Sequence, residues 1–174
     1  MLLNAAYMGF ISGVQPRISF NYGSKNSEQL KNIIKYSLMI IYIFALFTFS
    51  LSRQNANFLI SIFTSKESSL FGITHNAFMI FSFGFLFNGI NIFTSGMFTA
   101  FSNGKVSAII SSLRTFIFFI IGMMIFPNLF GVNGVWMVVP FAEIITLIVS
   151  LVYIYKYRKE YMYENIFTKE SVAV

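Results

Sequence analysis

Five long apolar stretches, separated by short segments that hold nearly all of the charge, constrain the fold of this chain of 174 residues. Two of them, 106–126 and 135–155, each run 21 residues. That length is close to the roughly 20 helical residues that cross about 30 Å of hydrocarbon. The other three are 1–22, 36–52 and 71–101, and the last is long enough to span with a tilt or a kink. The sequence therefore predicts an all-α integral membrane protein with about five transmembrane helices.

The composition argues against several other classes of protein. Hydrophobic residues make up 56% of the chain and charged residues only 10%, well below the roughly 25% usual in soluble domains. The chain has no cysteine and no aspartate, and His75 is its one histidine. These are too few groups for a thiolate metal site, a catalytic triad or a carboxylate pair. We therefore expect neither an enzyme nor a protein with a cofactor or a metal.

The net charge of +6 indicates topology rather than nucleic-acid binding, because the basic residues do not form a phosphate-tracking face. The basic residues on one predicted side are Lys25, Lys31, Lys35, Lys105, Lys156, Arg158, Lys159 and Lys169. The opposite side holds only Arg53 and Lys66. The positive-inside rule then places the C-terminus in the cytoplasm and the N-terminus outside. We expect a multi-pass protein of the cell membrane, with lipid as a partner and no nucleic acid.

The segments between the apolar stretches predict how the helices are joined. Residues 23–26 form a turn by composition, 53–57 are polar, and 127–134 predict a short outer hairpin. The apolar run 58–63 is too short to span, so it predicts an amphipathic helix in the outer interface that ends at Lys66 and Glu67.

The chain has no internal repeat and no linker, so one membrane domain is the simplest description. We expect residues 1–160 to form the transmembrane part and 161–174 to form a cytoplasmic tail, and the end from residue 156 to be solvated, because charge alternates with tyrosine from there on.

Polar residues inside the spans recur at helical spacing. Each such residue is costly in hydrocarbon and usually faces a bundle interior or a cavity. The three stripes are Ser12, Gln15 and Ser19; Asn88, Asn91, Ser95 and Thr99; and Glu143, Thr146 and Ser150. Two interpretations remain open: the stripes hold helices together by hydrogen bonds, or they line a cavity. Segment 36–52 has no such stripe and is predicted to be the helix most exposed to lipid.

Arg114 and Glu143 are the two charges well inside a span. Along antiparallel helices each lies about 12 Å from an opposite face, which leaves them roughly 6 Å apart in depth. A long arginine side chain covers that difference. Either they form a structural ion pair, or Glu143 exchanges a proton or meets a cationic substrate. Pro16 and Pro140 lie inside predicted helices, where a break marks either a transport hinge or a packed kink.

Several short motifs occur in an order and spacing that resemble the second half of transporters of the multidrug and toxic compound extrusion (MATE) family. Residues 13–26 resemble the family signature Q-P-x-x-x-x-N-x-G-A-x-N, with Ser24 in place of the common alanine. The further motifs lie at residues 63–67, 87–91, 102–105, 112–114, 130–136 and 140–143. The resemblance extends over about residues 9–160 and is closest to the MepA-like branch.

The resemblance implies a twelve-helix exporter made of two six-helix lobes, with a substrate cavity between them and exchange against protons or sodium. This chain would supply the last five helices of the C-terminal lobe and would need the missing N-terminal lobe as a partner. The expected cargo is a small amphipathic organic cation. We expect Gln15, Asn88, Asn91 and Glu143 to face the cavity, with Arg114 holding Glu143. Because the chain has no aspartate, Glu143 is its only membrane carboxylate.

Two alternatives remain at this stage. A lipid-linked oligosaccharide flippase of related architecture would need several basic groups in its cavity for a pyrophosphate. A non-transporting assembly partner or remnant would use its polar stripes entirely in contacts among the five helices, leaving no open polar groove.

Overall fold

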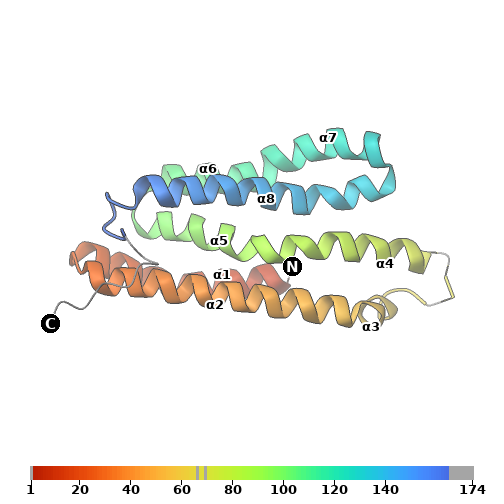
Figure 1. Cartoon of the computed structure of the whole chain (residues 1–174), viewed down its shortest axis with the longest axis horizontal. Coiled ribbons are helices and arrows are strands. Elements are labelled where there is room, and N and C mark those ends of the chain that lie inside the picture. Colours follow the sequence, from red (N-terminus) through yellow and green to blue (C-terminus); the bar gives the residue numbers. More distant parts are fainter. Residues whose placement is uncertain (1, 66, 69, 165–174) are drawn as a thin grey trace.

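The computed structural model describes residues 2–65, 67–68 and 70–164, and this part of the chain consists of helices and the turns that join them. Figure 1 shows the helices as long rods lying side by side. In chain order they are α1 (Leu2–Gly23), α2 (Ser27–Gln54), the short α3 (Ala56–Ser61), α4 (Leu70–Phe81), a 3₁₀ turn η1 (Ser82–Gly84), α5 (Phe85–Ala100), α6 (Gly104–Ser112), a π-helical turn η2 (Leu113–Ile117), α7 (Phe118–Phe130) and α8 (Val132–Tyr157). The predicted all-α fold is confirmed.

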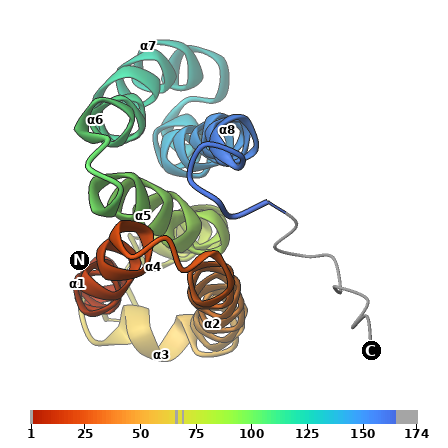
Figure 2. The same ribbon diagram turned by 90° about the vertical axis from the view of Figure 1, so that its left-hand side faces the viewer.

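The rod made by α4 and α5 lies in the middle of the molecule. Figures 1 and 2 show α1 and α2 on one side of it and the α6–α7 rod with α8 on the other. α5 contacts α1, α2, α6 and α8 and buries more of its residues than any other helix. Polar side chains of α5 can therefore meet partners on both sides of the bundle.

Four helical units of the described chain are long and apolar enough to cross a membrane: 27–54, 70–100, 104–130 and 132–157. α1 is a fifth helix of 22 residues that packs along α2 and α5. Its sequence includes Asn4, Gln15 and Arg17, which lower its apolar character, as expected for stretch 1–22.

Two predicted helix boundaries differ from those of the structure: α2 begins earlier, within the polar segment, and α3 ends earlier. α2 begins at Ser27, where the Asn26 side chain accepts a hydrogen bond of 3.1 Å from the Gln29 backbone N–H. This cap satisfies one of the free donors of the first turn. α3 ends at Ser61 rather than at Glu67; Lys66 lies outside the described residues.

The predicted hairpin at 127–134 is much tighter than expected. α7 runs through Pro127 to Phe130, and α8 begins at Val132. Gly131 alone joins the two helices, with a φ of 58°. Glycine adopts this left-handed conformation without the penalty of a Cβ, so one residue is enough to reverse the chain.

That 36–52 is the helix most exposed to lipid stays a prediction, but within the described chain another segment is less buried. The most apolar window of 104–130 is only 11% buried within the chain, whereas that of 27–54 is 22% buried. α2 buries Ile34, Ile41 and Ala45 and contacts α1 and α5. α7 buries only Gly122, because α8 is its main neighbour.

The segment 71–101, predicted to span with a tilt or a kink, is interrupted by the 3₁₀ turn η1, and Arg53 at the end of α2 packs near this turn. Its Nη1 donates a hydrogen bond of 3.2 Å to the Met79 carbonyl. Its guanidinium carbon lies 5.3 Å from the ring centre of Phe49 and 5.0 Å from that of Phe83. A guanidinium within about 6 Å of an aromatic face is attracted to it, so Arg53 holds the end of α2 against α4 and η1.

The chain beyond α8 folds back onto the bundle. Tyr161 and Tyr163 are 5% and 1% exposed, and the Phe101 ring stacks on both, at centroid distances of 4.5 Å and 5.8 Å. The Asn103 amide donates to the Tyr161 hydroxyl at 2.9 Å, and the Tyr163 hydroxyl donates to the Ile154 carbonyl at 3.0 Å. Burial raises the pKa of both phenols, because the charged form loses hydration.

The expectation of a solvated tail is therefore wrong for these two tyrosines. They fill a space among aromatic rings at one end of the bundle. The alternation of tyrosine with charged residues in the sequence did not indicate this burial. Residues 165–174 of the predicted tail lie outside the described residues.

Candidate functional site

A partly open cavity of about 1290 Å³ is lined by residues of α1, α2, α3, α4, α5, η2, α7 and α8. Its walls are mainly apolar, and seven phenylalanines contribute to them. These are Phe44, Phe58, Phe63, Phe78, Phe81, Phe85 and Phe119. Its polar lining includes Asn4, Asn88, Arg114 and Glu143. The cavity thus combines an aromatic surface with a charged pair, Arg114 and Glu143.

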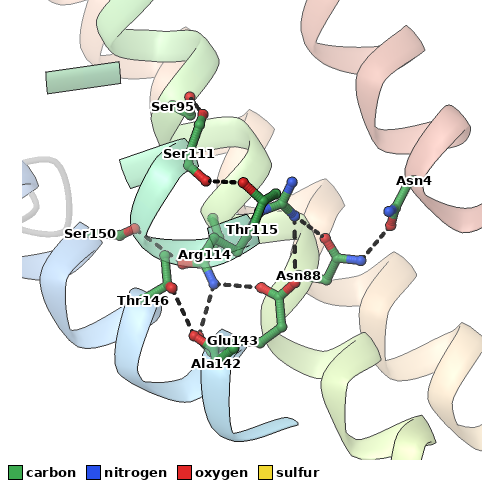
Figure 3. Close-up of polar contacts among 11 residues, drawn as sticks. Asn4, Asn88, Ser95, Ser111, Arg114, Thr115, Ala142, Glu143, Thr146 and Ser150 are labelled. Atoms are coloured by element: carbon green, nitrogen blue, oxygen red, sulfur yellow. Dashed lines mark hydrogen bonds and ion pairs between the residues drawn. The ribbon is translucent and has the colours of Figure 1, made fainter. Parts of the chain in front are cut away.

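Arg114 and Glu143 form the ion pair that their depths predicted. Arg114 Nη1 lies 3.4 Å from Glu143 Oε1 and donates a shorter hydrogen bond of 2.8 Å to Asn88 Oδ1 (Figure 3). The two charged side chains are 14% and 9% exposed. Two opposite charges in contact make burial in the bundle far less costly than either would be alone.

Arg114 lies on the π-helical turn η2. Such turns are rare and occur often at functional sites, because the inserted residue changes the direction of nearby side chains. No residue of η2 itself is buried, yet Arg114 reaches across to Asn88 on α5 and Glu143 on α8.

Asn91 lies behind Glu143, away from the cavity lining. Its Nδ2 donates to Glu143 Oε2 at 2.8 Å and to the Glu143 backbone carbonyl at 2.9 Å. The Ser150 hydroxyl donates to Asn91 Oδ1 at 3.0 Å. Asn91 is 1% exposed, so it contacts the carboxylate and not the cavity.

Gln15 lies apart from this cluster. Its Nε2 donates to the Gly96 carbonyl at 3.0 Å, across the interface of α1 with α5. A Cβ at Gly96 would come within 2.3 Å of Ile11, so the two helices approach closely there. The structure therefore brings together four of the five predicted site residues and places Gln15 in a helix contact.

The sequence analysis missed Asn4, which accepts a hydrogen bond from the Asn88 amide and lines the cavity. A lone asparagine in an apolar stretch was the available signal, since such a group is costly in hydrocarbon. Asn4 belongs to no stripe, so helical spacing did not select it.

Hydroxyl groups of the α5 stripe are used between helices. Ser95 contacts the hydroxyls of Ser107 and Ser111 at 2.9 Å and 2.8 Å, and Thr99 contacts Ser107 at 2.8 Å. These bonds join α5 to α6 and support the interpretation that serines and threonines hold the helices together. Among the residues that the structure describes, no group of three histidine, cysteine, aspartate or glutamate side chains could hold a metal.

The family model for MatE matches residues 1–126, well over half of the chain. The chain belongs to the MatE family. The resemblance found in the sequence motifs is confirmed, and the protein is a multi-pass membrane protein of a family of transporters.

A curated MatE relative is the multidrug export protein MepA of Staphylococcus saprophyticus. It is 32% identical over 133 residues, which cover 74% of this chain and 27% of that protein. The chain thus spans about a quarter of this relative's length.

Three solved structures share the fold of this MatE chain. A MATE crystallised in complex with MaL6 has a TM-score of 0.84 and 21% identity over 92% of this chain and 37% of its own. An inward-facing multidrug resistance MATE family transporter of the MOP superfamily has a TM-score of 0.85 and 20% identity, covering 95% of this chain and 38% of its own. An outward-facing one has a TM-score of 0.84 and 21% identity, covering 92% and 36%.

Proposed function

We propose that this chain is part of a secondary efflux transporter that exchanges amphipathic organic cations against protons or sodium ions. The observation that carries the proposal is the cavity whose phenylalanine-rich walls meet the carboxylate of Glu143. Aromatic faces attract cations and bury flat apolar surfaces, and a carboxylate supplies the opposite charge. A cargo with an apolar body and one positive charge fits both features.

Glu143 is the proposed coupling group. Its carboxylate can pair with a proton, a sodium ion or a cationic cargo, and each competes with the others for the same charge. Arg114 would lose its ion partner when Glu143 is neutralised or engaged. The Asn88 carbonyl oxygen, 2.8 Å from Arg114 Nη1, already accepts a hydrogen bond and keeps the guanidinium paired. When the ion pair loosens, this neutral amide keeps one guanidinium donor hydrogen-bonded, although the charge of Arg114 loses its counter-charge.

The proposed orientation places the C-terminus in the cytoplasm. The α1–α2 turn, the α5–α6 turn and the segment after α8 lie at one end of the bundle, where Tyr22 contacts the rings of Phe101 and Tyr161 at 5.2 Å and 5.4 Å. Lysines of these three segments gather at this end, and Arg53 lies toward the other. This distribution supports a cytoplasmic C-terminus by the positive-inside rule.

Transport by this chain is proposed to need an N-terminal lobe as a partner. The matches to less than two fifths of each solved transporter chain support this requirement. The described helices resemble the inward-facing and outward-facing transporters equally well, at 0.85 and 0.84. That similarity supports movement of the lobe as one unit against its partner.

The alternatives are less well supported. Arg114 is the one basic side chain among the described residues that line the cavity, which is a poor supply of positive charge for the pyrophosphate of a lipid-linked oligosaccharide. An assembly partner would use its polar groups internally, as Ser95 does, but Arg114 and Glu143 remain on the cavity surface.

The test measures accumulation of ethidium, a fluorescent organic cation, in cells that express the chain with and without the N-terminal lobe of a MATE transporter. We expect lower accumulation only with both parts present, and loss of this effect in Glu143→Gln. Glu28→Gln, an exposed residue at the start of α2, is the matched control. Varying the sodium and pH gradients separately identifies the coupling ion. Unchanged efflux and pH dependence in Glu143→Gln would remove Glu143 from the mechanism, and failure with every partner lobe would favour the assembly role.

A further inference from the structure

The two carboxylate oxygens of Glu143 have different surroundings. Oε2 accepts a hydrogen bond of 2.8 Å from the Asn91 amide, which is 1% exposed. Oε1 lies 3.4 Å from Arg114 Nη1, and the side chains of Arg114 and Glu143 both line the cavity. One oxygen is therefore occupied by a neutral buried group, and the other contacts a charged side chain at the cavity.

The orientation of the Asn91 amide is fixed by chemistry. Its NH₂ group faces two oxygens of Glu143, the carboxylate Oε2 and the backbone carbonyl at 2.9 Å, and an ionised carboxylate and a carbonyl only accept hydrogen bonds. A turned amide would place its own oxygen against both of them. The Ser150 hydroxyl, 0% exposed, donates to Asn91 Oδ1 at 3.0 Å and stabilises this orientation.

We propose that Asn91, held by Ser150, is a positioning residue: its amide occupies Oε2 of Glu143, so that a proton or cation binds at Oε1. The Asn91 amide NH₂ occupies one lone pair of Oε2 and lowers the basicity of that oxygen, which favours Oε1 as the site of the proton. Among the described residues Arg114 is the charged side chain that pairs with Glu143, and it contacts this same oxygen. Arrival of a proton or cation at Oε1 thus directly competes with Arg114.

The role of Asn91 in transport rests on the proposed function, but its effect on which oxygen of Glu143 takes the proton does not. The first readout is therefore infrared difference spectroscopy of the membrane-reconstituted chain over a range of pH. The band that disappears in Glu143→Gln belongs to the protonated carboxyl of Glu143. We expect one narrow band in the unmodified chain. In Asn91→Leu, which has a similar size and no amide, the band broadens or splits because either oxygen takes the proton.

The second readout is ethidium efflux with the partner lobe. Loss of hydrogen bonds to a charged group lowers the maximal rate in Asn91→Leu by about 10- to 100-fold, with a smaller change in KM. Ser150→Ala keeps the amide contact and gives the same changes to a smaller extent. Asn128→Ala, an exposed asparagine whose amide donates to the Met124 carbonyl of its own helix, is the control and leaves the band unchanged.

A band of unchanged shape in folded Asn91→Leu overturns the inference, even where Glu143→Gln abolishes efflux. If Asn91→Leu does not fold, the band of Ser150→Ala decides: a broadened band supports the inference and an unchanged band overturns it. If Glu143→Gln leaves efflux intact while Asn91→Leu broadens the band, the transport proposal fails and the assignment of the oxygens stands.

Discussion

Gly134, near the start of α8, is the position at which a single methyl group should disturb the fold most directly. A Cβ placed there would lie 2.1 Å from the Phe126 carbonyl oxygen and 2.8 Å from the Pro127 nitrogen of α7. Ordinary van der Waals contact begins at 3.4 Å, so the Cβ of Gly134→Ala would lie about 1.3 Å too close to this oxygen. The atoms that would have to move are backbone atoms of a neighbouring helix, which cannot turn aside as a side chain can.

The expected cost of Gly134→Ala follows from this geometry. Replacing a glycine by alanine inside a helix normally stabilises by about 0.5–1 kcal/mol. Overpacking that forces a backbone shift costs about 1–3 kcal/mol, or somewhat more. The strain outweighs the helix gain, so the free energy of unfolding decreases. In a chain of this length each 1 kcal/mol corresponds to about 2–4 °C in Tm.

The assay is thermal unfolding of the detergent-solubilised chain. Gly72→Ala in α4 is the matched control, because a Cβ there meets nothing within 4 Å. We expect Gly134→Ala to lower Tm by several degrees and Gly72→Ala to leave Tm equal or raise it slightly. Equal Tm changes in the two variants would refute the argument that backbone contact with α7 requires glycine at 134.

Three further predictions concern the two ends of the bundle. Arg53→Met removes the charge that binds two aromatic rings and a helix carbonyl, so it should lower the free energy of unfolding by about 1–2 kcal/mol. Arg17→Met, at an exposed arginine, is the control and should leave the free energy of unfolding unchanged. Equal losses in the two variants would show that the contacts of Arg53 do not stabilise the fold. Tyr163→Ala empties a fully buried aromatic site and should destabilise by about 3 kcal/mol, detected as a lower Tm and faster proteolysis after α8; an unchanged Tm would show that the segment adds nothing. Tyr161 and Tyr163 have a raised pKa in the folded chain, so the stability that their neutral phenols contribute is present below pH 10.0, the ordinary tyrosine pKa, and decreases as pH rises above it. The measurement is phenolate absorbance during a pH titration. If the phenolates of these two tyrosines appeared at the same pH as those of exposed tyrosines, the prediction would be contradicted.

The class of the protein and much of its site could be predicted from the amino-acid residues alone. Hydrophobic length predicted the spanning helices, because a bilayer admits few other structures. Depth along antiparallel helices predicted that Arg114 and Glu143 meet, which they do at 3.4 Å. The motifs predicted the family because their order and spacing are preserved along the chain, and the family model confirms it.

The contacts of each polar residue depend on how the helices pack, so they could not be predicted in the same way. Helical spacing gives the face of a helix but not its neighbour, so Gln15 and Asn91 belonged to equivalent stripes. Packing then placed Gln15 against a backbone carbonyl of α5 and Asn91 against the carboxylate of Glu143. Likewise, the burial of Tyr163 depends on rings contributed by distant segments, and local sequence contains no information about those rings.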